Sequence, residues 1–290
     1  MKYKTPYDLR QAIAHHLRML SKGQGISVER LRRHLAFERL LARLFKEPKP
    51  AWVLKGGYAM ELRTQNARVT KDVDLTIPEG SNIPTEQSKI SVALYDSLTN
   101  ALAEDLGDFF SFSVREKSVE LVGPPNGGVR FHVSAILDGR IFAEFHVDIG
   151  TGDVRIWPFE KLACRNLLAF AGVDCPAFPS IPAEQQFAEK LHAHTFQQDG
   201  KSSSRVKDLT DMVLLIQGGE MDRSKLLSVL QQTFAKRNTH PLPDELPLFS
   251  DEWAEQFATL ATKCRLEMTL MDASLLVKNY FKKIVSGVAP

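Results

Sequence analysis

Apolar residues recur at helical spacing along the N-terminal part of the chain. Thr5-Pro6 is typical of an N-cap followed by a first-turn proline, and it predicts a helix that runs to about Leu20. Gly25 interrupts the pattern, and Ser27 predicts the cap of a second helix. One stripe of this second helix is apolar and consists of Leu31, Leu35, Leu40, Leu41 and Leu44. Its other face is basic and carries Arg30, Arg32, Arg33, Arg39 and Arg43.

The next segment changes to short apolar runs separated by glycine, proline and polar residues. Residues 52–54 predict a buried strand that ends at Gly56-Gly57, and residues 58–63 predict a short helix. A second strand is expected around residues 72–77, and a helix around residues 92–104. This order of strand, helix, strand and helix is typical of a sheet with helices packed on it.

Alternating apolar and polar residues then predict further strands at 109–117, 129–136 and 140–149. Asp138-Gly139 is a strong signal for a two-residue hairpin turn between the last two.

Beyond residue 159 the spacing of apolar residues is helical. Helices are expected at about 159–171, 183–196, 205–217, 223–235, 250–262 and 271–285. We therefore predict an α+β fold, with a mixed sheet flanked by helices and followed by a helical domain. The expected division is basic helices at 1–50, the core at 51–160 and the helical domain at 161–290.

Composition is ordinary for a globular protein, with 43% hydrophobic and 25% charged residues. No stretch approaches the roughly 18 unbroken apolar residues of a membrane span, and the N-terminus has no apolar signal core. Cys164, Cys175 and Cys264 are too few and too scattered to predict a disulfide framework or a zinc site. A reducing cytoplasm is the expected compartment.

The charges are unevenly distributed along the chain. Residues 1–50 hold 12 Lys/Arg against 4 Asp/Glu, whereas residues 51–290 hold 25 against 31. Such a basic block favours contact with a polyanion such as nucleic acid. The alternative is a pair of amphipathic helices whose basic faces are merely solvated.

Two acids carry the strongest chemical signal. Residues i and i+2 of a strand point to the same face, so Asp72 and Asp74 share one side while Val73 and Leu75 face the core. Mg²⁺ takes oxygen ligands, usually a few carboxylates together with substrate phosphates. The pair therefore predicts a metal clamp, although two exposed acids on an edge strand would look the same.

The residues around this pair strengthen the interpretation. Gly56-Gly57 connects a strand directly to a helix, where backbone N–H groups can hold phosphate, although a plain tight turn would have the same sequence. Asp148 lies near the end of the strand at 140–149, on the face shared by Glu144 and His146. It is a candidate third metal ligand, or an ordinary turn residue.

Three runs of sequence resemble the AbiEii/AbiGii toxin family, nucleotidyltransferases of type IV toxin–antitoxin and phage-defence systems. They are residues 35–45 (LAFERLLARLF), 53–63 (VLKGGYAMELR) and 70–75 (TKDVDL). The resemblance continues in 147–150 (VDIG), 189–193 (EKLHA) and 205–211 (RVKDLTD), and it says little about the last 70 residues. It implies a DNA-polymerase-β-like nucleotidyltransferase fold.

The family pattern also implies roles for single residues in its N-terminal motifs. Gly56-Gly57 and the adjoining Tyr58 correspond to the phosphate-binding turn, and Asp72 and Asp74 to the metal ligands. Many nucleotidyltransferases of this fold have a small hydroxyl residue where this chain has Tyr58. The interval of 14 residues between Gly57 and Asp72 is also longer than in compact versions of the motif.

The later motifs supply the other candidates. A lysine such as Lys190 would contact the nucleotide phosphates, and Asp211 would be an additional catalytic acid, with Arg205 and Asp208 beside the nucleotide. From the residues alone, Lys190 can equally be a surface lysine. Asp211 has Lys207 four residues before it and can form an ordinary solvated salt bridge with it.

The resemblance implies an Mg²⁺- or Mn²⁺-dependent transfer of a nucleotide from an NTP to RNA, in a cleft between the two halves of the chain. The 3′ end of tRNA is the acceptor we favour, because adding nucleotides there would block translation. A cognate antitoxin is the expected protein partner. The alternatives are transfer to a protein such as the antitoxin, a non-catalytic nucleotide- or RNA-binding module, and a metal-dependent nuclease.

Overall fold

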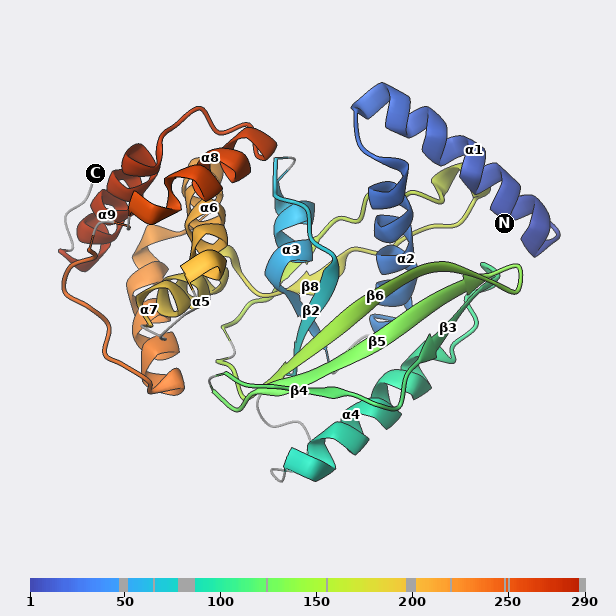
Figure 1. Ribbon diagram of the computed structural model, residues 1–290. Coiled ribbons are helices and arrows are strands. Elements are labelled where there is room, and N and C mark those ends of the chain that lie inside the picture. The colour runs from blue at the N-terminus through green and yellow to red at the C-terminus, as the bar shows by residue number, and fades with distance from the viewer. Residues whose placement is uncertain are drawn as a thin grey trace. The chain divides into compact units, whose positions relative to one another are not determined.

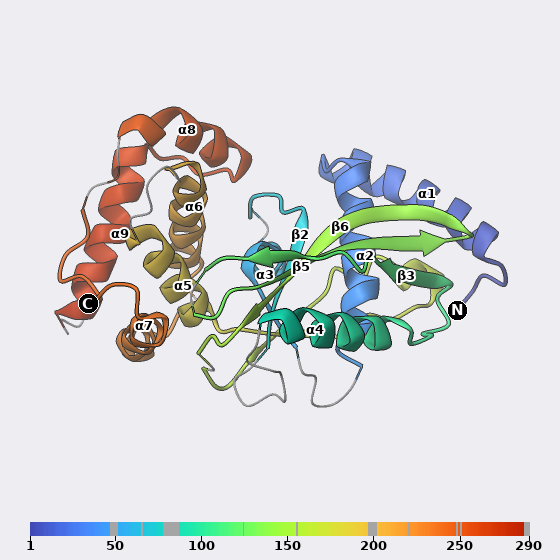
Figure 2. The same ribbon diagram turned by 60° about the horizontal axis from the view of Figure 1, so that its bottom comes forward.

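The computed structural model describes residues 1–46, 52–64, 66–77, 87–123, 125–154, 156–196, 202–219, 221–247, 249 and 251–286 (Figures 1 and 2). The chain divides into two compact units, and each consists of three separate stretches. Unit 1 comprises Met1–Tyr58, Val69–Gly152 and Lys161–Ser180. Unit 2 comprises Ala59–Arg68, Asp153–Glu160 and Ile181–Pro290.

Unit 1 begins with the two predicted helices, α1 (Pro6–Gln24) and α2 (Val28–Leu44). The Thr5 side chain accepts a hydrogen bond from the Asp8 N–H, and the Ser27 side chain accepts one from the Arg30 N–H, so both predicted N-caps are confirmed. Gly25 ends α1 in the left-handed conformation.

The second helix is more buried than its basic face predicted. From position 34 to its end at 44, every residue of α2 is buried. These include Arg39 and Arg43, whose guanidinium groups both bond to the carboxylate of Asp108. Neither arginine is available to solvent or to nucleic acid, so both interpretations of the basic face are wrong for these two residues.

The sheet of unit 1 is mixed, as predicted, with the strand order β3-β5-β6-β2-β1-β8-β7 and with β4 paired to β5. The strands are β1 (Val53–Lys55), β2 (Asp72–Ile77), β3 (Phe110–Val114), β4 (Val119–Leu121), β5 (Gly128–Leu137), β6 (Arg140–Thr151), β7 (Glu160–Leu162) and β8 (Phe178–Ser180). Strand β2 runs antiparallel to β1 and parallel to β6.

Strands β5 and β6 form the predicted hairpin, in which Asp138 and Gly139 have φ values of 55° and 64°. A bulge shifts the register at Ala135/Ile136, so that Phe142 is an extra residue in β6. The predicted alternation of buried and exposed side chains along β6 holds after the bulge but is wrong before it. Ile141, expected on the buried face, is 62% exposed, whereas Phe142 is buried.

One face of this sheet is covered by helices of the same unit. Helix α2 packs against β6, and α4 (Gln87–Leu102) packs against α2, β3 and β5 (Figure 2). The buried positions of β5 and β6 therefore alternate with half-exposed ones, which carry the polar side chains discussed below.

Unit 2 is a helical assembly around a second apolar core. Its helices are α3, whose residues Ala59–Arg63 belong to it, α5 (Ala183–Thr195), α6 (Ser202–Gly218), α7 (Arg223–Arg237), α8 (Ala254–Lys263) and α9 (Leu270–Val285). Helix α5 packs on α6 and α7, and α6 also packs on α8 and α9.

The helix predicted at 159–171 is wrong. This segment contains β7 and the single 3₁₀ turn Ala169–Ala171, and β8 follows it without having been predicted. Asn166 adopts a φ of 54°, which a continuous helix does not permit. None of the helices among the described residues is both long enough and apolar enough to cross a membrane.

Candidate active site

The three predicted metal ligands lie together on neighbouring strands of unit 1. Asp74 of β2 and Asp148 of β6 are direct partners in the parallel pair, and Asp72 is the partner of His146. Asp148 lies inside β6, three residues before its end, so it is a strand residue rather than a turn residue. Val73 points to the opposite face and is fully buried.

Gly56 and Gly57 lie directly against the Asp74 carboxylate. The Gly57 N–H donates a hydrogen bond to Asp74 Oδ2 at 3.1 Å. A Cβ added to Gly56 would be 2.0 Å from the same oxygen, and one added to Gly57 would be 2.7 Å from Thr70 Oγ1. Gly56 also has a φ of 66°. The backbone at Gly56 and Gly57 lies so close to Asp74 and Thr70 that only glycine fits at both positions. The Gly57 N–H, which we predicted to hold phosphate, donates to the Asp74 carboxylate in this structure and orients it.

Tyr58 follows these glycines in the first turn of α3 (Gly56–Arg63), but its side chain points into the core. It is 0% exposed and packs on the rings of Phe37, at 4.9 Å, and His34, at 5.7 Å. In this conformation the hydroxyl cannot reach a nucleotide in solvent. What Tyr58 can offer a phosphate is its backbone N–H.

Arg130 is a member of this site that the sequence did not indicate. It lies on β5 directly opposite Asp148 and binds that carboxylate with two hydrogen bonds, Nε to Oδ1 at 2.7 Å and Nη2 to Oδ2 at 2.6 Å. Arg130 Nη2 is also 3.7 Å from Asp72 Oδ2. On the other side of Asp72, His146 Nδ1 is 3.4 Å from Oδ1.

Negative charge is in excess at this site. The pKa of Asp74 is raised to about 6, mainly by burial and also by the neighbouring carboxylates of Asp148 and Asp72, against the opposing effects of the Gly57 N–H and Lys55. A carboxyl group in this state is stabilised by an added cation. Arg130, whose own pKa is raised mainly by its hydrogen bond to Asp148, supplies part of that positive charge.

The donor set fits a hard divalent cation, since it consists of carboxylate oxygens on one face of two adjacent strands. Asp72 and Asp74 are the residues that would hold it. Asp148 would join them only after Arg130 turned away, because both of its oxygens accept bonds from the guanidinium. Among the described residues, the three carboxylates do not bring their ligand atoms within 4.8 Å of one another.

The later candidates form a second charged cluster inside unit 2. Lys190 of α5 lies with its Nζ 2.5 Å from Asp211 Oδ2 and 3.5 Å from Asp208 Oδ1, both on α6. Arg205 Nη1 is 3.0 Å from Asp208 Oδ2. Arg68, which was not predicted, donates from Nε and Nη2 to the Asp211 carboxylate. The structure therefore brings together all four predicted residues of this group.

Burial distinguishes this cluster from an ordinary surface ion pair. Asp211 is 0% exposed and Lys190 only 8% exposed. Burial alone would raise the pKa of Asp211, but Lys190 and Arg68 outweigh it and hold the pKa below its usual value. Burial would likewise lower the pKa of Lys190, but Asp211 and Asp208 raise it. Lys190 is thus a buried, charged lysine rather than a surface residue, and Asp211 pairs with it.

Each cluster belongs to a single unit, with the acids of β2 and β6 in unit 1 and the Lys190 cluster in unit 2. The expectation that both face one cleft stays a prediction. A polar segment at 197–204 leads from α5 to α6. Its residues 197–201 lie outside the described residues, and α6 begins at Ser202.

Comparison with known protein families identifies one that matches this chain. The family described as nucleotidyl transferase AbiEii toxin, type IV TA (toxin–antitoxin) system, matches residues 39–281. This range includes every candidate residue named above. No curated protein sequence matches the chain.

Among solved structures, the chain is similar to MenT4, a nucleotidyltransferase toxin from Mycobacterium tuberculosis H37Rv. The TM-score is 0.55 at 17% identity, over 97% of this chain and 90% of that one. At this identity the likeness concerns the fold, and it confirms the predicted nucleotidyltransferase fold. JHP933 from Helicobacter pylori is similar at a TM-score of 0.46 and 14% identity, over 90% of this chain and 94% of that one.

Proposed function

The chain belongs to the AbiEii family of nucleotidyltransferase toxins of type IV toxin–antitoxin systems, and on that premise we propose that it transfers a nucleoside monophosphate from an NTP to RNA. The acceptor we propose is the 3′ end of tRNA, where an added nucleotide would prevent aminoacylation. The reaction would use Mg²⁺ and take place in the cytoplasm. A cognate antitoxin is the partner that would restrain it.

One observation carries this proposal, namely the three carboxylates on adjacent strands with the Gly57 N–H fixing one of them. Asp72 and Asp74 would hold Mg²⁺ (or Mn²⁺), which supplies charge neutralisation for the triphosphate and activation of the attacking hydroxyl. The hydrogen bond from Gly57 restricts the Asp74 carboxylate to one orientation, so little reorganisation is needed when the nucleotide binds.

In unit 2, Lys190 is the group we propose to bind the phosphates. Its ammonium is kept charged and oriented by Asp211 and Asp208, and Arg205 lies on the far side of Asp208. When an anionic triphosphate binds, it would replace part of the contact between the Lys190 ammonium and these carboxylates. Asp211 itself would act by positioning Lys190, because it is fully buried and already accepts bonds from Lys190 and Arg68.

An RNA acceptor is supported by a basic pocket in unit 1. Helices α1 and α2 and strand β6 line it with Arg10, Arg18, Arg32 and Arg140. Arg10 also bonds to Asp138, and the guanidinium of Arg32 lies over the ring of Phe142 at 5.5 Å. Guanidinium groups on an apolar floor suit phosphates and stacked bases. We propose this pocket as the part of the basic block at residues 1–50, together with Arg140, that contacts RNA.

The test is to incubate the purified protein with total cellular RNA, Mg²⁺ and each α-³²P-labelled NTP in turn. We expect label in RNA of tRNA size with one NTP, and no label with Asp72→Asn. Asp96→Asn changes an exposed acid of α4 and is the matched control, which should retain full transfer.

Each other result contradicts part of the proposal. Label in an added antitoxin, with none in RNA, would identify a protein acceptor. RNA that shortens without NTP would indicate a nuclease. Nucleotide binding without any label, in the presence of both acceptors, would indicate a binding module.

A further inference from the structure

Two cysteines far from the carboxylate site lie close together in unit 1. Cys164 follows β7 by two residues and Cys175 precedes β8 by three, so the pair closes the base of the irregular connection between these strands. The third member is Glu38, from the buried part of α2. One ligand atom from each of the three lies within 4.8 Å of the other two.

These separations are close to those of a metal site. Zinc binds thiolate at about 2.3 Å and carboxylate oxygen at about 2.0 Å with tetrahedral angles, which places two sulfur ligands about 3.8 Å apart. The three ligand atoms, all within 4.8 Å of one another, are near that spacing. Cys164 and Cys175 are both partly exposed, so an ion has access to them.

Glu38 supplies the second, independent observation. Its side chain is 1% exposed, and its Oε2 accepts a hydrogen bond from the Leu167 N–H at 3.0 Å. The backbone N–H groups of Arg165 and Asn166 also face this carboxylate. Its Oε1 is buried and accepts no hydrogen bond of regular geometry from the described residues. A buried acceptor without a partner destabilises the fold, and more so when it is charged, unless a cation satisfies it.

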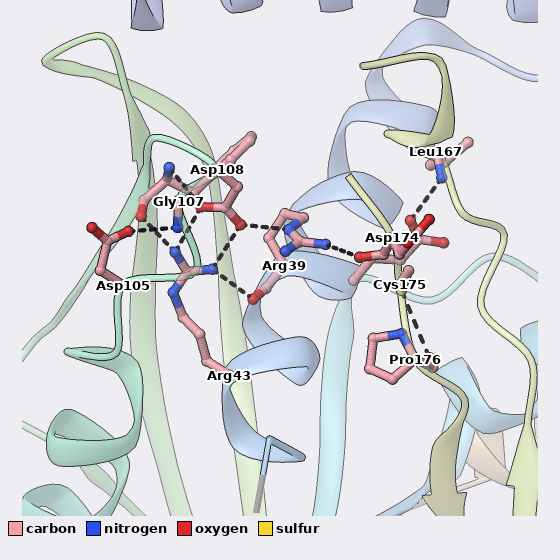
Figure 3. A network of polar contacts seen from close by, with 11 residues as sticks. Arg39, Arg43, Asp105, Gly107, Asp108, Leu167, Asp174, Cys175 and Pro176 are labelled. Atoms are coloured by element: carbon pink, nitrogen blue, oxygen red, sulfur yellow. Dashed lines mark hydrogen bonds and ion pairs between the residues drawn. The ribbon is translucent and has the colours of Figure 1, made fainter. Parts of the chain in front are cut away.

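The surroundings hold the three ligands in place without competing for them. Arg39, next to Glu38 in α2, is bound to Asp108 through Nε and to the Asp174 carbonyl through Nη1 (Figure 3). It therefore fixes the backbone directly before Cys175. The Cys164 thiol contacts the Cys175 thiol, the Cys175 carbonyl at 3.4 Å and the backbone of Asn166, and the Cys175 thiol contacts the Pro176 carbonyl at 3.8 Å.

We propose that Glu38, Cys164 and Cys175 form a zinc-binding site with water as the fourth ligand. The bound zinc would link the β7–β8 connection to α2. Thiolates select zinc over Mg²⁺, so this site is chemically distinct from the carboxylates of β2 and β6. The sequence did not indicate it, because ten residues separate the two cysteines and the third ligand comes from a distant helix.

The test uses the full-length protein, reduced and freed of metal, titrated with Co²⁺ as a spectroscopic substitute for zinc. We expect one cobalt per chain to give sulfur-to-cobalt charge-transfer absorption and the visible bands of tetrahedral Co²⁺, both lost when zinc is added. Cobalt held by the carboxylates of β2 and β6 would add no sulfur absorption. Cys164→Ser and Cys175→Ser should each weaken zinc binding by more than about 100-fold, and Glu38→Gln by about 10- to 100-fold.

Two variants make the result specific. Cys264→Ser removes the third cysteine, which is buried in unit 2, and should leave the cobalt spectrum unchanged. Asp72→Asn should also leave it unchanged, so that failure of the transfer reaction and failure of this site are separate results. Circular dichroism of each variant establishes that it is folded.

Three outcomes would overturn the proposal. They are the absence of any sulfur-to-cobalt absorption at saturating Co²⁺, sulfur absorption that survives in folded Cys164→Ser, and a Cys164–Cys175 disulfide that persists under reducing conditions and excludes the metal.

Discussion

Two arginine–aspartate sites in unit 1 use the same chemical groups for different purposes. Around Asp108, two arginines meet one carboxylate, and all three side chains are at most 3% exposed (Figure 3). Around Asp148, one arginine meets a carboxylate that has two further acids beside it, and the arginine side chain is 36% exposed. The first site has excess positive charge and the second has excess negative charge.

The hydrogen bonds show what this difference means. Arg43 donates to both Asp108 oxygens and to the Phe110 carbonyl, and the Phe110 N–H donates to Asp108 in turn. Asp108 thus has no capacity left for a ligand, which is the state of a structural ion pair. Among the described residues, the Asp148 carboxylate accepts its side-chain hydrogen bonds from Arg130, in a half-exposed position where a stronger cation can compete. Excess negative charge and partial exposure, rather than the ion pair itself, indicate the functional site.

The largest effect is expected at the carboxylate site, on activity and not on stability. Asp74→Asn keeps an oxygen for the Gly57 N–H but removes a metal ligand, so transfer should fall by at least about 1,000-fold, or about 4 kcal/mol of transition-state stabilisation. The free energy of unfolding in urea should stay equal or rise, because a buried charge is removed. Loss of activity together with clear destabilisation would show that Asp74 is structural.

The reverse is expected at the structural site. Asp108→Asn leaves Arg39 and Arg43 buried without a countercharge, and the free energy of unfolding should fall by about 3–5 kcal/mol. Asp105→Asn is the control, because Asp105 is exposed and its amide replacement can still accept from the Gly107 N–H. If the two variants have equal unfolding midpoints in urea, the buried pair does not stabilise the fold.

The same site predicts a pH dependence. Burial would raise the pKa of Asp108, but Arg43 and Arg39 hold it below its usual value. The folded state thus binds the proton more weakly than the unfolded chain does. The stability from Asp108 is complete above pH about 4, the ordinary pKa of an aspartate, and is lost as pH falls through the lower folded pKa. Thermal unfolding between pH 5 and 3 should show a steeper decline for the wild type than for Asp108→Asn.

The smallest effect is expected for Arg130→Gln, which frees Asp148 and removes a competing positive charge. The Mg²⁺ concentration for half-maximal transfer should fall several-fold, and the free energy of unfolding should change by less than about 1 kcal/mol, because the pair is half-exposed. Arg115→Gln changes an exposed arginine of the same sheet and serves as the control. An unchanged or higher Mg²⁺ requirement would contradict competition between Arg130 and the metal.

The sequence by itself determined the local features. Helix caps at Thr5 and Ser27, the Asp138-Gly139 hairpin, and the shared face of Asp72 and Asp74 all follow from residues close in the chain. The resemblance to the family motifs added the kind of enzyme and the second cluster, and the family match over residues 39–281 supports it. The predicted roles of the individual site residues stay predictions until the variants are measured.

Only the tertiary structure decided which distant groups meet. An unbulged hairpin centred on Asp138-Gly139 would pair Arg130 with Val147 on the core face; the extra residue Phe142 moves the partner to Asp148. The burial of Arg39, Arg43 and Tyr58 likewise depends on packing between elements. Periodicity reports which side of one helix or strand is apolar, but register, bulges and contacts across the fold arise from the packing of all elements at once.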